Sequence, residues 1–384
     1  MSITFTVIRL SVATAVFLAS LLTVVPAPVN FLWKLSIVVL EAGYWLVVPC
    51  ILLALWCFGS GTYGKISGLL FLCSAILLAS PLIRAWQSAY RLEREYHRGF
   101  GKRIPESTSF HRTRILSWKD LLLGIQFPAV KPQRRVYSHH EGDSLEMNFY
   151  AARRPSAPCI VIIHGGGWDG GDREQLPALN SYFASLGYAV ASLDYRLAPE
   201  HRYPAPVQDV RDALTFLHTH ATDMNIDASR IILLGRSAGG QIALQAAYTL
   251  KDPSIKGVIS FYGPADMVFG YSLPGNPWLL DSRKLMEQYL GGSYMQHPQA
   301  YHASSPVEAL NSTSPPTLLL HGHRDVLVSY QHTVHMEMAM SRRDIPHFTV
   351  DLPWATHGYD YVFSGPGSQI GLYFMERFLS EVSK

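Results

Sequence analysis

The chain has 384 residues, enough for one large domain and an additional segment. Charged residues make up only 16% of the chain, and this deficit is concentrated in its first part. The net charge of +3 is mild and argues neither for nor against a nucleic-acid partner. Of the four cysteines only Cys159 lies beyond the apolar N-terminal part, which excludes a disulfide within the remainder, and no Cys/His spacing resembles a zinc site.

Three long stretches near the N-terminus contain no charged residue. These uncharged stretches are 10–33, 42–64 and 66–83. Each reaches the roughly 18 to 20 residues that are needed to cross a hydrocarbon core. We therefore expect three membrane helices, near 8–25, 35–58 and 66–83. A cleaved signal peptide is the alternative for the first stretch, and a buried core helix is the alternative for the third.

A dense basic cluster follows the third uncharged stretch. Its members are Arg84, Arg91, Arg94, Arg98, Lys102, Arg103, Arg112 and Arg114. Such a cluster beside a membrane helix usually marks the cytoplasmic side, and it can also contact anionic lipid headgroups. A solvated helix-and-linker face is the alternative. We expect 1–83 to be a transmembrane segment and 84–133 to be a basic juxtamembrane linker.

The basic residues also predict the orientation of the chain. The loops after the first two stretches hold only Lys34 and Lys65, so the cluster outweighs them and favours a cytoplasmic face for the rest of the chain. Three spans would then place the N-terminus outside, which Arg9 mildly opposes. Two spans would place the N-terminus and Arg9 on the cytoplasmic side as well. The cluster supports a cytoplasmic face for the rest of the chain under either count.

From about Arg134 to the end, the pattern predicts a soluble α/β domain. A hairpin is expected over 135–150, and an amphipathic helix over 207–218. Short apolar strands are expected at 159–163, 188–193, 231–234, 257–262, 317–320 and 348–350, and further helices near 283–290, 329–341 and 367–382. Strands that alternate with helices in this way indicate a mainly parallel sheet covered on both faces.

A candidate nucleophile lies where one of these strands ends. The apolar run 231–234 is followed by Gly235-Arg236-Ser237-Ala238-Gly239 and then by the helix-forming stretch 241–247. A strand, a sharp turn and a helix are the context in which Gly-x-Ser-x-Gly presents a serine nucleophile. The helix N-terminus that follows directs backbone N–H groups towards an oxyanion formed there. An ordinary strand-to-helix turn is the alternative.

A serine nucleophile requires a base and an acid that orients the base. Asp325 lies in the loop after the predicted strand 317–320, and His357 lies after the next strand. The order serine, acid, histidine is that of α/β-hydrolase triads. Both residues are expected at the carboxyl edge of the sheet, where Ser237 also lies.

The stretch His164-Gly165-Gly166-Gly167-Trp168 follows the predicted strand 159–163. Glycines allow the backbone to approach an oxyanion closely and to direct N–H groups at it. We expect Gly165 and Gly166, together with Ala238, to donate to the oxyanion. His164 is expected to hold this loop, and Trp168 and Arg236 are candidate substrate contacts.

Three motifs in this order resemble the hormone-sensitive-lipase-like branch of the α/β-hydrolase esterases. They are 164–168, the run 194–206 (Asp-Tyr-Arg-Leu-Ala-Pro-Glu-His-Arg-Tyr-Pro-Ala-Pro) and 235–240. The resemblance covers roughly 134–384. It implies an α/β-hydrolase fold and carboxylic ester hydrolysis through an acyl-serine, without a cofactor or metal.

The chain departs from the family at Arg236, where the family usually has an acidic residue. This cation either alters the preference for charged substrates or pairs with a nearby carboxylate. The insertion 263–306 resembles part of small feruloyl- and acetyl-esterase-like hydrolases. It is expected to form a lid or pocket wall, and simple packing of its aromatic residues is the alternative.

The sequence thus predicts a membrane-anchored serine esterase with a catalytic domain over 134–384. Its expected partners are a small-molecule or lipid ester and membrane lipids, and no nucleic acid. A hydrolase of another acyl compound is one alternative, with a prenylcysteine methyl ester, an aryl formamide or a peptide as the substrate. A non-catalytic membrane binding protein that retains the fold is the other.

Overall fold

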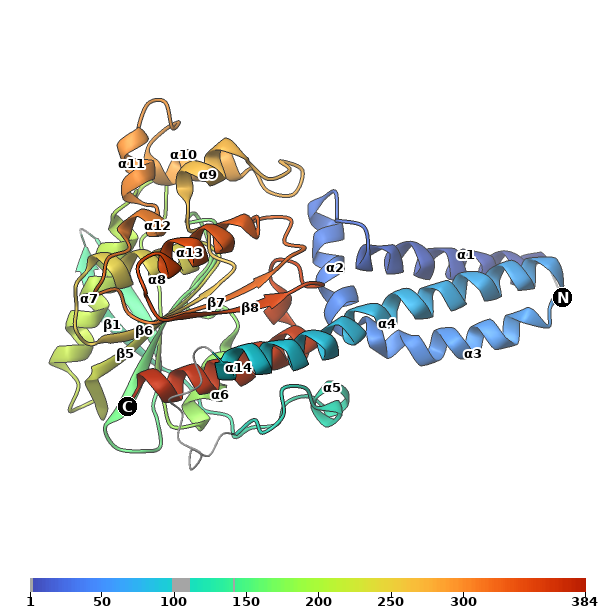
Figure 1. The fold of residues 1–384 in the computed structure, drawn as a ribbon, viewed down its shortest axis with the longest axis horizontal. Coiled ribbons are helices and arrows are strands. Elements are labelled where there is room, and N and C mark those ends of the chain that lie inside the picture. The colour runs from blue at the N-terminus through green and yellow to red at the C-terminus, as the bar shows by residue number, and fades with distance from the viewer. Residues whose placement is uncertain (1–2, 99–110, 141) are drawn as a thin grey trace.

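The computed structural model describes residues 3–98, 111–140 and 142–384, and an eight-stranded sheet lies at its centre. The strands are β1 Gln133–His140, β2 Asp143–Tyr150, β3 Ala157–Ile163, β4 Ala189–Leu193, β5 Ile226–Arg236, β6 Ile255–Phe261, β7 Thr317–Gly322 and β8 His347–Leu352. Their order across the sheet is β1-β2-β4-β3-β5-β6-β7-β8 (Figure 1). Only the β1–β2 and β2–β4 pairs are antiparallel among these neighbours, so the expected mainly parallel sheet is confirmed.

Helices cover both faces of the sheet. They include α6 Pro177–Ser185, α7 Ala205–Thr219, α8 Ala238–Thr249, α13 Gln331–Ser341 and α14 Pro366–Val382, whereas the short helix α5 Trp118–Leu123 lies away from the sheet (Figure 1). Successive side chains of a strand point to opposite faces. In β3, Cys159, Val161 and Ile163 therefore join the core beneath α7 and α8, whereas Ile160 and Ile162 join the core beneath α6 and α14. A strand buried on both faces needs an unbroken apolar run, which explains the composition of β3.

The insertion between β6 and β7 carries four short helices above the carboxyl edge of the sheet. They are α9 Met267–Ser272, α10 Ser282–Leu290, α11 Pro298–Ala303 and α12 Pro306–Ala309. The side chains of Asp266 and Asp281 cap α9 and α10 by accepting bonds from backbone amides in the first turn. The insertion forms one side of the cavity described below, as expected for a lid or pocket wall.

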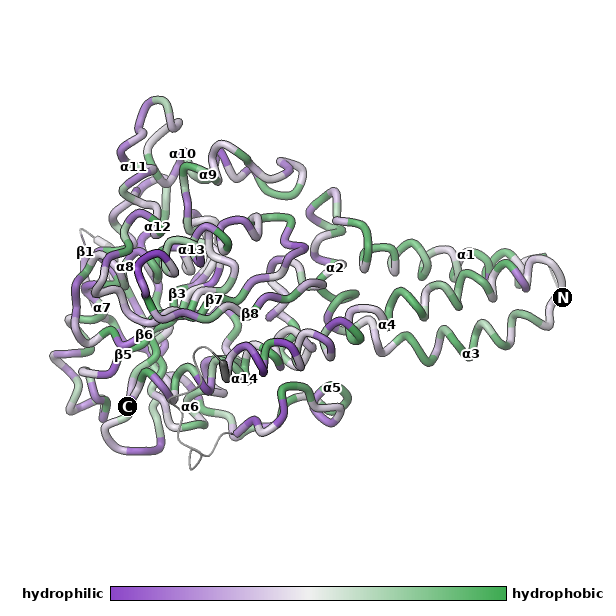
Figure 2. The backbone as a smooth tube through the Cα atoms, in the orientation of Figure 1, coloured by the Kyte–Doolittle hydropathy of each residue, from purple (hydrophilic) through white to green (hydrophobic). Residues whose placement is uncertain are grey.

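Four further helices form the N-terminal part of the chain. They are α1 Ile3–Ser20, α2 Asn30–Ala42, α3 Val47–Phe58 and α4 Gly61–Arg98. By length and composition, three segments of the described chain are long and apolar enough to cross a membrane: Ile3–Thr23, Asn30–Phe58 and Gly61–Tyr96. Figure 2 shows apolar residues along α1, α3 and the adjoining half of α4, which together project from the domain as a bundle.

The second expected membrane helix, 35–58, is not continuous. Helix α2 ends at Ala42, a 3-10 turn covers Gly43–Leu46, and α3 begins at Val47. Figure 1 shows α2 lying across the end of the bundle, against the α/β domain, while α3 runs along the bundle. The break follows from the contacts of α2, because Glu41 accepts hydrogen bonds from Trp354 Nε1 (3.0 Å) and Gly367 N (2.8 Å) of the domain.

The third expected membrane helix extends further than 66–83. Helix α4 continues to Arg98, so the boundary predicted at residue 83 falls within one helix of 38 residues. Its second half packs on the sheet through Ala85, Ala89, Leu92 and Tyr96, which follow helical spacing and are buried. Because arginines are abundant in this region, the sequence resembles a solvated linker and the apolar stripe is hard to recognise. The described part of 84–133 is thus in part a packed helix, and 99–110 lies outside the described residues.

Candidate active site

Ser237 occupies the sharp turn between β5 and α8. Its backbone has φ 52° and ψ −122°, a conformation that non-glycine residues seldom adopt. A Cβ on Gly235 would lie 2.0 Å from the carbonyl oxygen of Gly239, and one on Gly239 would lie 2.2 Å from that of Ile163. Both positions therefore require glycine, and the turn leaves the Ser237 hydroxyl facing a cavity.

The three predicted triad residues come together at the carboxyl edge of the sheet. Nε2 of His357 lies 3.0 Å from Ser237 Oγ, and its Nδ1 lies 2.7 Å from Asp325 Oδ2. A carboxylate only accepts, so the Nδ1 of His357 carries the proton and its Nε2 accepts from the serine hydroxyl. This is the arrangement in which a histidine removes a proton from a serine nucleophile.

Asp325 is fully buried and held by donors on both oxygens. Its Oδ1 accepts from the backbone amides of Leu327 and Val328 (both 2.8 Å), and its Oδ2 accepts from His321 Nε2 (3.1 Å) as well as from His357. Burial by itself would raise the pKa of Asp325, but the adjacent histidines hold that pKa well below its usual value. Asp325 is therefore ionised throughout the neutral range.

The histidine at position 321 also belongs to the site, although no motif in the sequence singles it out. His321 is completely buried at the end of β7, and its Nδ1 lies 2.7 Å from Thr333 Oγ1. Its Nε2 faces the carbonyl oxygen of Val328 (3.1 Å) as well as Asp325. Because both of those groups only accept, Nε2 carries the proton and donates to Asp325. The only signal in the sequence is a histidine four positions before the acid.

The glycine loop follows β3, and one of its predicted oxyanion donors is already engaged. The amide of Gly165 donates to Gln175 Oε1 at 2.8 Å. Gly166 has φ 137°, and a Cβ there would lie 2.0 Å from Gly170 O, so its glycine is required. Gly167 lines the cavities on both sides of Ser237, which makes it a better candidate donor than Gly165.

His164 holds this loop, as the sequence analysis expected. Its ring stacks on Tyr195 with centroids 4.2 Å apart, and its Nδ1 donates to the carbonyl of Gly165 (2.8 Å). Burial lowers the pKa of His164, so the ring is neutral and suited to packing rather than to binding an anion.

Trp168 and Arg236, the two candidate substrate contacts, are both buried and both bound to protein groups. Trp168 lines one cavity, but its Nε1 donates to Gln241 Oε1 (2.9 Å) and its ring stacks on Tyr289. Arg236 Nε donates to Asp360 Oδ2 at 2.6 Å. Of the two alternatives for Arg236, pairing with a nearby carboxylate is thus the one seen here, and the charge of Arg236 is neutralised beside the nucleophile.

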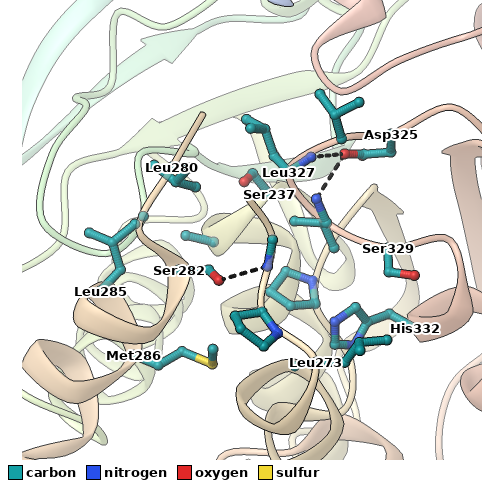
Figure 3. A pocket seen from close by; sticks show the side chains of 18 of the residues that line it. Ser237, Leu273, Leu280, Ser282, Leu285, Met286, Asp325, Leu327, Ser329 and His332 are labelled. Carbon is teal, nitrogen blue, oxygen red and sulfur yellow. Dashed lines mark hydrogen bonds between the residues drawn. The ribbon is translucent and has the colours of Figure 1, made fainter. Parts of the chain in front are cut away.

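Two cavities meet at Ser237. The first, of about 230 Å³, lies under the insertion and is mainly apolar (Figure 3). Its apolar lining includes Leu273, Leu280, Leu285, Met286 and Leu327. The second, of about 370 Å³, shares Leu280, Leu285 and Leu327 with the first. Its lining also includes His357, Arg236, Asp169 and Gln175. A nucleophile between two cavities is suited to a substrate with a separate part on either side of the reacting carbon.

A family comparison agrees with this geometry. The BD-FAE family model matches residues 145–340, about half of the chain. The chain belongs to the BD-FAE family. The matched range contains Ser237, Asp325 and the glycine loop, and it ends before His357.

Relatives of this BD-FAE protein agree with the resemblance to hormone-sensitive-lipase-like esterases, which is thereby confirmed. Esterase LipC of Mycobacterium tuberculosis is 29% identical over 222 residues, which cover 53% of this chain and 53% of LipC. The probable carboxylic ester hydrolase LipM of the same organism is 28% identical over 244 residues, 59% of this chain and 55% of LipM. This chain therefore spans about half the length of the curated relatives that it matches.

A solved structure shows the same fold. The structure titled Bacterial Heroin Esterase matches with a TM-score of 0.59 and 25% identity, covering 69% of this chain and 88% of that one. Together with the sheet order, this confirms the predicted α/β-hydrolase fold of the BD-FAE domain. The 69% coverage leaves part of this chain unmatched.

One cluster elsewhere in the domain has the residue types of a metal site. The ligand atoms of His140, Asp209 and Asp212 all lie within 4.8 Å of one another. Asp209 pairs with Arg196 Nη2 (2.7 Å), and Asp212 lies 2.9 Å from His140 Nε2. These ion pairs account for the cluster as a structural network.

Proposed function

We propose that this chain is a serine hydrolase of carboxylic esters. The observation that carries the proposal is the bonded series Ser237, His357 and Asp325 at the junction of two cavities. The names of the relatives support ester hydrolysis, because LipC is called an esterase and LipM a probable carboxylic ester hydrolase. In this chemistry no group beyond the chain's own residues and water is needed.

In the acylation step, Ser237 Oγ forms a bond to the ester carbonyl carbon while Nε2 of His357 takes the hydroxyl proton. The carbon–oxygen bond to the alcohol then breaks, and His357 returns the proton to the leaving alkoxide oxygen. In deacylation, water replaces the alcohol: His357 removes one proton from the water, and the water oxygen bonds to the acyl carbon. The bond between that carbon and Ser237 Oγ then breaks, and His357 returns the proton to Ser237 Oγ. The products are one alcohol and one carboxylic acid.

The tetrahedral oxyanion of each step requires N–H donors. We assign these to Gly166 and Ala238, as the sequence analysis did, and to Gly167 in place of Gly165, whose amide is bonded to Gln175. Ala238 is the first residue of α8, so its amide adds the positive end of that helix dipole.

We further propose that the chain is an integral membrane protein whose catalytic domain faces the cytoplasm. The bundle supports three crossings. Helix α1 begins at the end of the bundle farthest from the domain and runs towards it, α3 runs away from the domain, and α4 returns to it (Figure 1). The 3-10 turn of four residues and the twelve residues of α3 together measure about 26 Å, close to the thickness of a hydrocarbon core. The basic residues from Arg84 onward support the cytoplasmic side.

Labelling of the purified full chain by a soluble fluorophosphonate tests the acyl-serine proposal. We expect one modified residue, Ser237, and release of acid from a panel of esters that differ in acyl length. A folded protein that neither reacts with the reagent nor turns over any ester would support the alternative of a non-catalytic binding protein.

A fusion of alkaline phosphatase after Lys384 tests the orientation, since this reporter is active only outside the cytoplasm. We expect an inactive reporter on an intact, stably expressed fusion. Strong phosphatase activity would place the catalytic domain on the outer face.

A further inference from the structure

The end of the α/β domain nearest the bundle carries large apolar side chains that are open to the surroundings. They come from α2, the turn after it, α5 and the segment between α9 and α10. We call them the apolar collar: Phe31, Trp45, Trp118, Leu122, Leu123, Leu273 and Trp278. Trp278 is 75% exposed and Phe31 is 73% exposed, which is unusual for a group of such residues in a soluble domain.

Hydrogen bonds join the segments that carry the collar and hold them at the same distance along the axis of the bundle. The amide of Asn30 donates to the carbonyl of Trp278 (3.2 Å), and the Asn276 side chain donates to the carbonyl of Pro28 (2.9 Å). On the other side, Tyr44 Oη donates to the carbonyl of Leu121 in α5 (2.8 Å). The collar is thus built around the base of the bundle, with tryptophans of the kind that lie at the boundary between lipid and water.

The domain is fixed with respect to the bundle. Helix α4 runs from the bundle onto the sheet, where Arg91 pairs with Asp351 (2.6 Å) and Tyr96 packs against Phe348 with ring centroids 4.9 Å apart. Glu41 adds the bonds from α2 to the domain. If the bundle crosses a bilayer, these contacts set the height of the domain, and the apolar collar lies at the bilayer surface.

The active site opens towards this same level. Asn30 and Trp33 of α2 line the second cavity beside Ser237, and Trp33 Nε1 donates to the carbonyl of His357 at 3.0 Å. Leu273, a member of the collar, lines the first cavity. Helix α2 and the segment between α9 and α10 therefore belong both to the collar and to the walls of the site.

We propose that Ser237 receives its substrate directly from the bilayer surface, and that this substrate is an amphiphilic ester anchored in the membrane. This inference rests on the proposed ester hydrolysis and names its substrate class. The apolar collar seats the entrance in the headgroup layer, so that the ester reaches the serine without crossing water.

The two cavities assign the two parts of that ester. His357 must deliver its proton to the leaving oxygen, and it lines the second cavity but not the first. The alcohol part therefore lies in the second cavity, against α2 and near Arg236 and Asp169. The acyl part lies in the first cavity, where Leu273 and Met286, which do not line the second cavity, provide an apolar surface.

The test uses fluorophosphonates tethered to a dialkyl phospholipid through spacers of increasing length, with the full chain in phosphatidylcholine vesicles. We expect Ser237 to react with the probe on the shortest spacer when the probe shares its bilayer, and not when the probe is in separate vesicles. A soluble fluorophosphonate, and the Ser237→Ala variant, serve as controls.

A pair of variants relates this reactivity to the collar. Phe31→Asp combined with Trp278→Asp places carboxylates at the lipid boundary, and we expect the ratio of tethered to soluble labelling to fall by about tenfold or more. Met295→Asp is the matched control. Met295 is 86% exposed and belongs to the segment between α10 and α11, and Figure 1 shows that segment away from the bundle, so the ratio should not change. The soluble probe also shows that each variant is folded.

The outcomes separate the two proposals. If the soluble probe labels Ser237 but the tethered probes need long spacers, substrate delivery from the bilayer is overturned and ester hydrolysis still stands. The same result is expected if the collar is covered by another protein and does not lie at the bilayer. A ratio that the double variant leaves unchanged would overturn the role of the collar. Failure of the soluble probe to label Ser237 would overturn the proposed function and this inference with it.

Discussion

His357 is held by two regions of the molecule that differ in kind. Its side chain is bonded to Asp325, which lies 32 positions earlier in the same domain. Its carbonyl oxygen is bonded to Trp33, which lies 324 positions earlier in the N-terminal helices. The first contact controls which nitrogen of the ring carries the proton, and the second controls only where the backbone lies. The comparison teaches that the α/β domain supplies the groups of the proposed chemistry, whereas the N-terminal helices contribute to the shape of the site.

This difference predicts a graded series of effects. A change in the groups that exchange protons should reduce turnover by several orders of magnitude. A change in the groups that support them should have intermediate effects, and a change in α2 should have the smallest effect on a dissolved ester.

The largest effect is expected for Ser237→Ala. It removes the atom that bonds to the acyl carbon, and loss of a triad serine costs a factor of about 10⁶ in turnover. His357→Ala should be similar, because the serine then loses its base. The measurement is kcat on a dissolved ester, with circular dichroism as the check on folding. Near-normal hydrolysis by folded Ser237→Ala protein would contradict the assignment of the nucleophile.

The second effect is expected for Asp325→Asn. The amide no longer fixes the proton on Nδ1 of His357, and such a change costs about 10⁴ in kcat. The variant also has a pH signature in stability. Because the folded-state pKa of Asp325 is lowered, its charge stabilises the fold above the usual aspartate pKa of about 4, and this stabilisation is lost as the pH falls further.

The control for Asp325→Asn is denaturant unfolding from pH 7 down to pH 3. The difference in the free energy of unfolding between wild type and variant should be constant at neutral pH and should shrink below about pH 4. A difference that is independent of pH would contradict an ionised Asp325 with a lowered pKa.

The third effect, on stability, is expected at Arg236. Arg236 and Asp360 are both buried, with side-chain exposures of 3% and 7%, so Arg236→Ala leaves a buried carboxylate without its cation. Breaking such a pair costs about 3–5 kcal/mol in the free energy of unfolding. Arg236→Met combined with Asp360→Asn removes both charges and should cost much less. Equal losses in the single and double variants would show that the pairing is not what stabilises this region.

The sequence predicted the juxtaposition of Ser237, Asp325 and His357 better than it predicted the surroundings of these residues. Ser237, Asp325 and His357 each follow a strand, and the parallel order of the strands brings their carboxyl ends together, so local pattern and chain order suffice. The roles of His321 and Gln175 depend on hydrogen bonds that their side chains make in the folded structure, and no local sequence pattern indicates these bonds. The spacing of apolar residues within one segment does not reveal where α2 lies in the fold. The contacts that place α2, Trp33 with His357 and Glu41 with Trp354, join residues more than 300 positions apart.

A smaller effect on turnover is expected at His321, which acts through Asp325. His321→Ala removes a donor to a buried carboxylate, and such a bond contributes about 1.5–3 kcal/mol, or about 10- to 100-fold in kcat. Without this donor the Asp325 carboxylate is more basic and stabilises the protonated ring of His357 more strongly, so the acid limb of the pH–rate profile should move to higher pH. His321→Gln retains an N–H donor and should restore most of both values. An acid limb that does not move would indicate a role in packing alone.

The smallest effect on a dissolved ester is expected at Trp33. Trp33→Phe keeps an aromatic ring in the second cavity but loses the hydrogen bond to the His357 carbonyl, and a neutral bond of this kind contributes about 1 kcal/mol, or about fivefold. The loss should appear in kcat, with KM unchanged, because the bond positions the base and does not touch the substrate. Trp33→Ala also removes the cavity wall and should raise KM. Trp45→Ala, in the exposed turn after α2, should change neither constant, and an equal loss in that variant would mean that Trp33 acts only through the stability of the N-terminal helices.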